Sequence, residues 1–250
     1  MGRAVRCRLA GRLVESHDGT LLPGLIDMHA HLVTDSGPNA LNRVAGYSEE
    51  ELDAVVTESL RAQLAAGVTT VRDLGDRGYA VVERRDRQRS APATEPRIVA
   101  FGPPVTSPAG HCHYLGGEVS GPDGLRAAIR ERVDRGTDGV KVMASGGMNT
   151  PGTDVMRTQF TDEELRLLVD AAHAAGLPVT AHAHGTPAVR QAIGCSVDGI
   201  EHCAASPTGA SATQATPCWP RSRTAVSPPA RPSAWSPPGW VSHRRHSRRC

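Results

Sequence analysis

The chain of 250 residues has few aromatic residues, with two Phe, three Tyr and three Trp, so an aliphatic core is expected. It lacks an apolar run of the ~18–20 residues that a membrane-spanning helix needs. It also lacks an apolar run of signal-peptide length near its start. We therefore expect a soluble, cytoplasmic protein with no membrane partner. The six cysteines show no CxxC pairing, which favours free thiols over a disulfide framework.

Acidic residues are absent from the last part of the chain. Residues 205–250 contain seven Arg, eight Pro and eight Ser, but no Asp, Glu, Leu, Ile, Phe or Met. Such a segment cannot bury enough apolar surface to offset the entropy lost on ordering, so we predict a disordered, low-complexity basic tail. The composition suits translation of a GC-rich gene in a wrong frame. We expect a truncated chain, frameshifted after about residue 204, with a further irregular segment at residues 1–20.

Between residues 21 and 204, strand-like and helix-like patterns alternate. Short apolar, β-branched segments predict strands at 24–32, 68–74, 97–102, 139–144, 178–184 and 199–203. Amphipathic stretches separate them, and two begin with capping boxes, Ser48 with Glu51 and Thr161 with Glu164. Residues 79–89 are a weaker helix candidate, because apolar residues end at Val82. This alternation predicts an α/β fold with a parallel sheet, either doubly wound or closed into a barrel.

The most informative motif is His29-Ala-His31, at the end of the first predicted strand. Residues i and i+2 of a strand point to the same face, so both imidazoles point into one space, as two ligands of one metal ion must. Lys141, His182 and His202 lie in later predicted strands. A closed barrel brings such strand ends together on one axis. We therefore predict an incomplete (β/α)8 TIM-like barrel over residues 21–204, with six of the eight strands visible.

Five ordered segments carry a resemblance to a known family. They are LLPGLIDMHAH (21–31), AGVTTVRDLG (66–75), GVKVMASGG (139–147), VTAHAHG (179–185) and GIEH (199–202). Together they resemble the amidohydrolase superfamily, metal-dependent hydrolases built on a (β/α)8 barrel. Within it, the chain looks most like the imidazolonepropionase-like and Xaa-Pro or arginine-type dipeptidase branch.

The resemblance implies a centre with two metal ions, usually zinc, although the same donors accept other divalent metals. His29 and His31 would bind the more buried ion, and His182 and His202 the second. Lys141 would bridge the two ions as a carbamate formed with CO2, and so take part in catalysis. A metal-bound hydroxide would then hydrolyse an amide, peptide or cyclic amide C–N bond. The implied substrate is a small molecule such as a dipeptide or an N-acyl amino acid.

Lys141 also has an interpretation from its neighbours alone. It lies between Val140 and Val142, in a segment that a parallel sheet buries on both faces. Burial of an unpaired ammonium is costly, and it favours the neutral amine that reacts with CO2. A surface lysine on an edge strand is the alternative.

Three further residues are expected to contact substrate. His184 shares a strand face with His182, and the resemblance favours His182 as the ligand and His184 as part of the pocket. His111 and Tyr114 lie in the long loop after the third predicted strand, where barrel enzymes select substrate. Ordinary loop packing is the alternative for both. Arg72 and Asp73 are expected to form a structural ion pair.

The family also needs an aspartate at the end of the eighth strand, and no Asp follows Asp198. We therefore expect this fragment to be inactive or impaired as an enzyme. The alternative is a non-enzymatic remnant that at most binds metal. A third hypothesis, in which the Arg-rich tail and its three Trp bind nucleic acid, is disfavoured because its charges follow no helix or strand pattern. The sequence is compatible with an oligomer.

Overall fold

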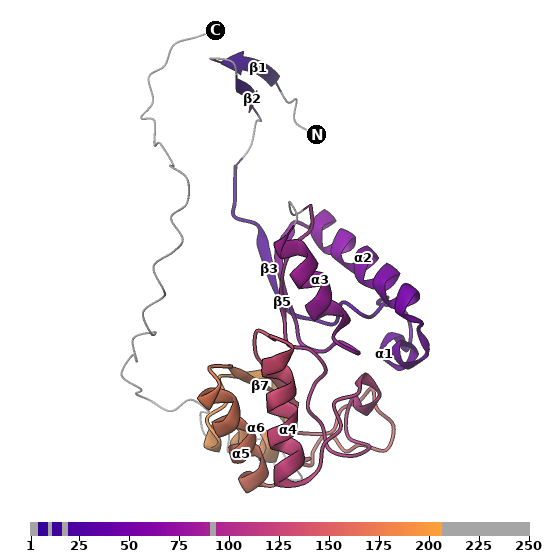
Figure 1. Cartoon of the computed structure of the whole chain (residues 1–250), viewed down its shortest axis with the longest axis vertical. Helices are drawn as coiled ribbons and strands as arrows, with labels where there is room; N and C mark the ends of the chain where they lie inside the picture. Colours follow the sequence, from indigo (N-terminus) through magenta and orange to yellow (C-terminus); the bar gives the residue numbers. More distant parts are fainter. Residues whose placement is uncertain (1–4, 10–11, 17–19, 91–93, 207–250) are drawn as a thin grey trace, which may run out of the picture. The chain divides into compact units, whose positions relative to one another are not determined.

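A computed structural model describes residues 5–9, 12–16, 20–90 and 94–206 (Figure 1). All of these residues belong to one compact unit, Met1–Ala210. The strands are β1 (Val5–Leu9), β2 (Arg12–Ser16), β3 (Leu25–Ala30), β4 (Val68–Asp73), β5 (Arg97–Ala100), β6 (Val140–Met143), β7 (Val179–Gly185) and β8 (Gly199–Ser206). The helices are α1 (Ala40–Arg43), α2 (Glu49–Ala65), α3 (Ala80–Arg89), α4 (Gly121–Asp134), α5 (Asp162–Ala174) and α6 (Thr186–Gly194), with 3-10 turns η1 (Val44–Gly46) and η2 (His113–Leu115).

Six parallel strands follow one another in chain order. They form two three-stranded sheets, β3-β4-β5 and β6-β7-β8. The segment after β5 joins the sheets, because Val105 N donates to Lys141 O at 2.8 Å and Met143 N donates to Val105 O at 2.8 Å. A doubly wound sheet would reverse its strand order at a switch point, whereas a barrel wall keeps it. The α/β class with parallel strands is thus confirmed, and the strand order is that of part of a (β/α) barrel.

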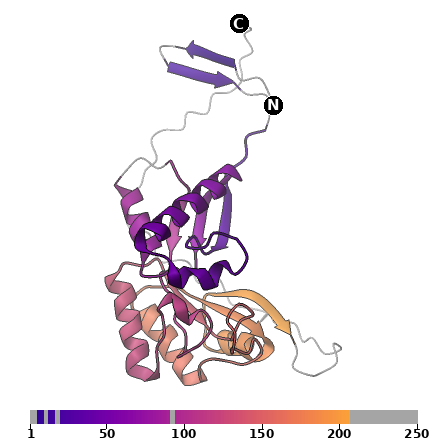
Figure 2. The same cartoon turned by 90° about the vertical axis from the view of Figure 1, so that its right-hand side faces the viewer.

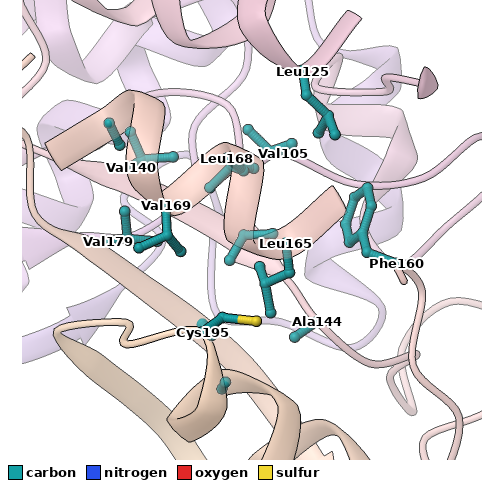
Figure 3. Packing of buried hydrophobic residues seen from close by; sticks show 14 of the residues in the cluster. Val105, Leu125, Val140, Ala144, Phe160, Leu165, Leu168, Val169, Val179 and Cys195 are labelled. Atoms are coloured by element: carbon teal, nitrogen blue, oxygen red, sulfur yellow. The ribbon is translucent and has the colours of Figure 1, made fainter. Parts of the chain in front are cut away.

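Helices cover the strands from one side. Helices α2 and α3 pack on β4 and β5, and α5 and α6 pack on β7 and β8 (Figures 1 and 2). In the second half, Leu165, Leu168 and Val169 of α5 are buried in one cluster with Val140 of β6 and Val179 of β7 (Figure 3). Each fully buried aliphatic side chain contributes ~1.5–3 kcal/mol. The predicted aliphatic core is therefore what holds these helices to the sheet.

Helix α5 begins at the capping box expected from the sequence. Thr161 Oγ1 accepts from Glu164 N at 3.2 Å, and Glu164 Oε2 accepts from Thr161 N at 2.9 Å. We expect Thr161→Ala to lower the free energy of unfolding by about 1 kcal/mol, because an N–H of the first turn loses its acceptor. Thr161→Ser keeps the hydroxyl and is the control. Urea unfolding of both variants tests this, and equal losses would contradict the capping role.

Helix α3 forms over most of the weak candidate segment. Its inward face buries Val81 and Val82 and then Arg85, which is 3% exposed. The Arg85 guanidinium bonds Asp138 Oδ2 at 2.6 Å. A buried ion pair thus continues the face where apolar residues end, which explains the weak apolar pattern of this helix.

The first 20 residues differ from the irregular segment that we expected. Strands β1 and β2 pair antiparallel there, with Val5 opposite Ser16 and Leu9 opposite Arg12. Apolar and Arg residues alternate in the sequence of β1, which is the period of a strand. The high Arg content hides this alternation when only composition is considered.

The predicted basic tail lies almost wholly outside the described residues. Its first two residues, 205 and 206, are the end of β8, which runs past the expected boundary at 204. At the other end of the strand order, β3 exposes Leu25 and Ile26, both 61% exposed, as expected for an open set of barrel strands. In the described residues, no helix has the length and apolar character to cross a membrane.

Candidate metal centre

His29, in β3, and His31, which directly follows the strand, each form a hydrogen bond through Nδ1. His31 Nδ1 lies 3.0 Å from Gly75 O, and His29 Nδ1 lies 3.0 Å from Glu201 Oε2. Both partners are acceptors, so both Nδ1 atoms carry the proton. In the neutral form of either ring the lone pair is on Nε2, where it can bind a metal ion.

Imidazole rings from β3, β7 and β8 meet in one place. The ring centroid of His29 lies 5.4 Å from that of His31 and 5.0 Å from that of His202. The centroid of His182 lies 4.8 Å from that of His202. One potential ligand atom each of His182, His184 and His202 lies within 4.8 Å of the others. The structure thus brings together all four predicted histidine ligands, with His184 beside them.

His182 leaves Nδ1 free for a metal ion, whereas His29 and His31 leave Nε2 free. Its Nε2 lies 3.1 Å from the carbonyl oxygen of Gly146 and must donate to it, which leaves Nδ1 as the free nitrogen. The backbone oxygen therefore selects the tautomer of this ring. Buried imidazoles held in one tautomer by an acceptor are what a metal site requires.

Lys141 is the only lysine in the chain. It lies in β6, is 1% exposed, and has no hydrogen-bond partner for Nζ among the described residues. Burial lowers its pKa from 10.5 to about 8, although the charge of Glu201 opposes the shift. It is also close enough to His31, His182 and His202 to depress their pKa values. A buried amine that has no partner and lies near these imidazoles is unexplained by packing alone.

Burial favours the neutral form of four of these imidazoles, those of His31, His111, His182 and His202. Burial lowers the pKa of His31 to about 3 and that of His182 to about 2, and the nearby Lys141 charge adds to both shifts. The pKa values of His111 and His202 are lowered to about 4, again mainly by burial. Neutral imidazole is the form that binds a metal ion.

Glu201 is a site residue that the pattern of β8 did not predict. Neighbouring residues of a strand point to opposite faces, so Glu201 and His202 should not share a site. His202, however, has φ 64°, a left-handed conformation that is rare for a residue with a side chain. This break in the alternation lets Glu201 contact His29 while His202 lies against the same ring. The positive φ at His202 could not be read from the sequence.

Arg72 and Asp73 do not form the expected ion pair. Arg72 Nη2 bonds Glu201 Oε1 at 2.6 Å. Asp73 instead accepts from two backbone N–H groups, Leu32 N at 2.7 Å and Gly75 N at 3.2 Å. Consecutive residues of β4 point to opposite faces, which separates the two side chains.

The three predicted substrate residues have different surroundings. The His111 ring lies 4.5 Å from that of His182, and the His184 ring stacks on that of His202 at 4.7 Å. The Tyr114 hydroxyl donates to Cys112 Sγ at 3.7 Å, and its ring centroid lies 5.5 Å from that of His113 in the same loop. His111 and His184 therefore border the cluster, and Tyr114 is held by its own loop.

Comparison with known proteins places the chain in a family. The family model described as Amidohydrolase family matches residues 20–208. Ochratoxinase from Aspergillus niger is 27% identical over 208 residues, covering 73% of this chain and 43% of that protein. A crystal structure of a Xaa-Pro dipeptidase with bound methionine superimposes with a TM-score of 0.65 at 32% identity, covering 72% of this chain and 48% of that one. A prolidase complexed with N-methylphosphonate-L-proline gives 0.63 at 31% identity, covering 71% and 47%.

These likenesses first define the class of fold, an α/β enzyme fold with parallel strands in barrel order. The chain belongs to the amidohydrolase family. It spans about half the length of the relatives that it matches.

Proposed function

We propose that this chain carries the metal centre of a hydrolase that cleaves C–N bonds in small molecules. The observation that carries the proposal is the convergence of imidazoles from β3, β7 and β8, with the buried, unpartnered amine of Lys141 near enough to act on their charges. Membership of the amidohydrolase family supports this reaction class.

The donor set fits two divalent metal ions. His29 and His31 would hold one ion through Nε2, and His182 and His202 would hold the other. Lys141 would join them after CO2 adds to its neutral amine, because a carbamate is an anionic oxygen donor and an ammonium is not. Zinc suits imidazole and oxygen donors at such a centre, and its hydrolytic chemistry is to acidify a water and polarise a carbonyl.

The residues beside the cluster would orient the substrate. The rings of His111 and His184 border the imidazoles of His182 and His202. His111 Nδ1 lies 2.8 Å from Thr150 Oγ1 and its Nε2 lies 3.5 Å from Cys112 Sγ, so this neutral ring would shape the pocket wall beside the substrate. Similarity to a Xaa-Pro dipeptidase, a prolidase and an ochratoxinase supports a dipeptide or an N-acyl amino acid as substrate.

The test measures metal content and turnover on the same preparations. We expect the full chain to bind about two zinc ions and His29→Ala to lose both zinc and any hydrolysis of dipeptides. His173→Ala is the matched control, since His173 is on α5 and pairs with Asp198 at 2.8 Å, away from the cluster. Zinc binding without turnover would favour a remnant that only binds metal. A wild-type chain that binds no zinc would overturn the proposal.

Gly75 provides a second test of the same centre. A Cβ at this position would lie 2.8 Å from both Cε1 and Nδ1 of His31, so the ring would have to move. We expect Gly75→Ala to weaken zinc binding about 10-fold, because the hydrogen bond that orients this ligand is lost. Gly46→Ala is the control, as no heavy atom lies within 4 Å of its Cβ position. Titration against a chromogenic chelator measures both variants, and equal affinities would contradict the role of His31.

A further inference from the structure

Glu201 joins three strands at the edge of the imidazole cluster. Its Oε2 lies 3.0 Å from His29 Nδ1 of β3. Its Oε1 accepts from Arg72 Nη2 of β4 at 2.6 Å and from the Thr180 hydroxyl of β7 at 2.6 Å. The residue itself belongs to β8 and is only 9% exposed. Three partners from three other strands hold this buried carboxylate in one position.

Arg72, the charged partner of this carboxylate, is itself held on both sides. Its Nε donates to Met28 O at 2.6 Å, and its guanidinium lies 5.9 Å from the ring centre of Phe101. Met28 is the residue before His29, so the guanidinium ties the backbone of β3 to Glu201 while Glu201 ties the His29 ring. Met28 and His29 are neighbours in the chain, Arg72 bonds the carbonyl of Met28, and Glu201 bonds both Arg72 and His29. These contacts hold both the position and the rotation of the His29 imidazole.

The carboxylate also decides which nitrogen of His29 is free. An ionised carboxylate only accepts hydrogen bonds, so Nδ1 must donate and Nε2 keeps its lone pair. The other rings lie close by, with centroids at 5.4 Å for His31 and 5.0 Å for His202. A carboxylate behind a ligand histidine raises its basicity as well as orienting it.

We propose that Glu201 is a positioning residue of the metal centre, anchored by Arg72, that orients His29 and sets its tautomer without binding an ion itself. The inference rests on the proposed function, because it assumes that His29 is a ligand. Both carboxylate oxygens already have partners, which distinguishes Glu201 from a ligand or a proton acceptor. It assigns a role to a residue that the alternation of β8 does not predict.

The experiment compares Glu201→Gln with a matched ion-pair variant in the full chain. Glu95 is a suitable control, because it is also a partly buried carboxylate paired with an arginine, Arg84, and contacts no histidine in the described residues. Zinc affinity is measured by competition with a chromogenic chelator. The tautomer of His29 is read from its side-chain 15N resonances. Circular dichroism checks that each variant is folded.

We expect Glu201→Gln to weaken zinc binding about 10- to 100-fold without changing the number of ions bound at saturation. The 15N spectrum should show a loss of the fixed Nδ1–H form of His29, and Glu95→Gln should match the wild type in both readouts. Arg72→Met removes the anchor and leaves the carboxylate in place, and we expect it to weaken binding in the same direction. The Arg72→Met variant keeps the inference testable if Glu201→Gln does not fold.

Three outcomes would overturn the inference. Unchanged affinity and tautomer in Glu201→Gln would make Glu201 an ordinary ion pair. Loss of one bound ion at saturation would make it a ligand. An equal loss of affinity in Glu95→Gln would mean that the effect is general destabilisation. A wild-type chain without zinc is a different result, because it overturns the proposed function before any variant is compared.

Discussion

Lys141→Met is expected to stabilise the metal-free chain by about 3 kcal/mol at pH 7 and to abolish binding of the bridged pair of zinc ions. Burial lowers the pKa of Lys141 from 10.5 to about 8, so at pH 7 the folded chain holds an ammonium that has no hydrogen-bond partner among the described residues. Each pKa unit is worth about 1.4 kcal/mol, which gives the size of the effect. Methionine fills a similar volume without the charge. Urea unfolding in a chelator and zinc titration measure the two effects.

The stability difference between Lys141→Met and the wild type is expected to depend on pH. The pKa of Lys141 is lower in the folded chain than in the unfolded chain, so the unfolded chain binds more protons between about pH 8 and 10.5. The stability of the wild type therefore rises with pH across this window, and the advantage of Lys141→Met shrinks over the same range. Lys141→Arg keeps a cation and should show neither the gain at pH 7 nor the window. A constant advantage of Lys141→Met at all pH values would contradict the account.

Acidification is expected to release zinc and unfold the chain in a single transition. Burial holds the pKa of His31 at about 3 and that of His182 at about 2, so protons do not compete for these ligands in the folded chain near pH 5. An exposed histidine with a pKa of ~6.5 would be almost fully protonated there. The metal should therefore stay bound until the fold is lost. Circular dichroism and released zinc, followed in one acid titration, provide the measurement.

Whether acid stabilises or destabilises the fold depends on whether the folded or the unfolded chain binds more protons. The pKa values of His31 and His182 are about 3 and 2 in the folded chain and near 6.5 when unfolded, so their contribution to stability is complete above pH 6.5 and is lost as the pH falls. Asp73 and Asp76 act in the opposite direction, because burial raises the pKa of both carboxyl groups. His111 and His202, whose pKa values burial lowers to about 4, add to the effect of His31 and His182. Zinc released near pH 6.5 with an unchanged spectrum would contradict the burial of the ligands.

The positions of the strands could be predicted because their apolar segments are short, β-branched and separated by helices with clear caps. His29, His31 and His182 could be placed by strand periodicity, since each shares a face with a residue two positions away. Lys141 stood out because a charged residue interrupts a buried segment. These signals are local, and the sequence contains them directly.

The remaining features depend on contacts between distant strands or on unusual backbone conformations. The pairing of Arg72 with Glu201 spans 129 residues, and the left-handed φ of His202 has no sequence signal. Arg85 occupies an apolar position of α3 only because Asp138 meets it there. Local patterns describe each element, whereas these partners are decided when the elements pack.

The central claim is that imidazoles from three strands and one buried lysine form a single centre for two metal ions. Native mass spectrometry of the full chain, prepared with zinc and bicarbonate, tests it most directly. Because Lys141 is the only lysine, a CO2 adduct that is lost in Lys141→Arg can be assigned to it and not to the N-terminal amine. The account predicts about two zinc ions and one such adduct on each chain. A chain that carries neither under saturating zinc would contradict it.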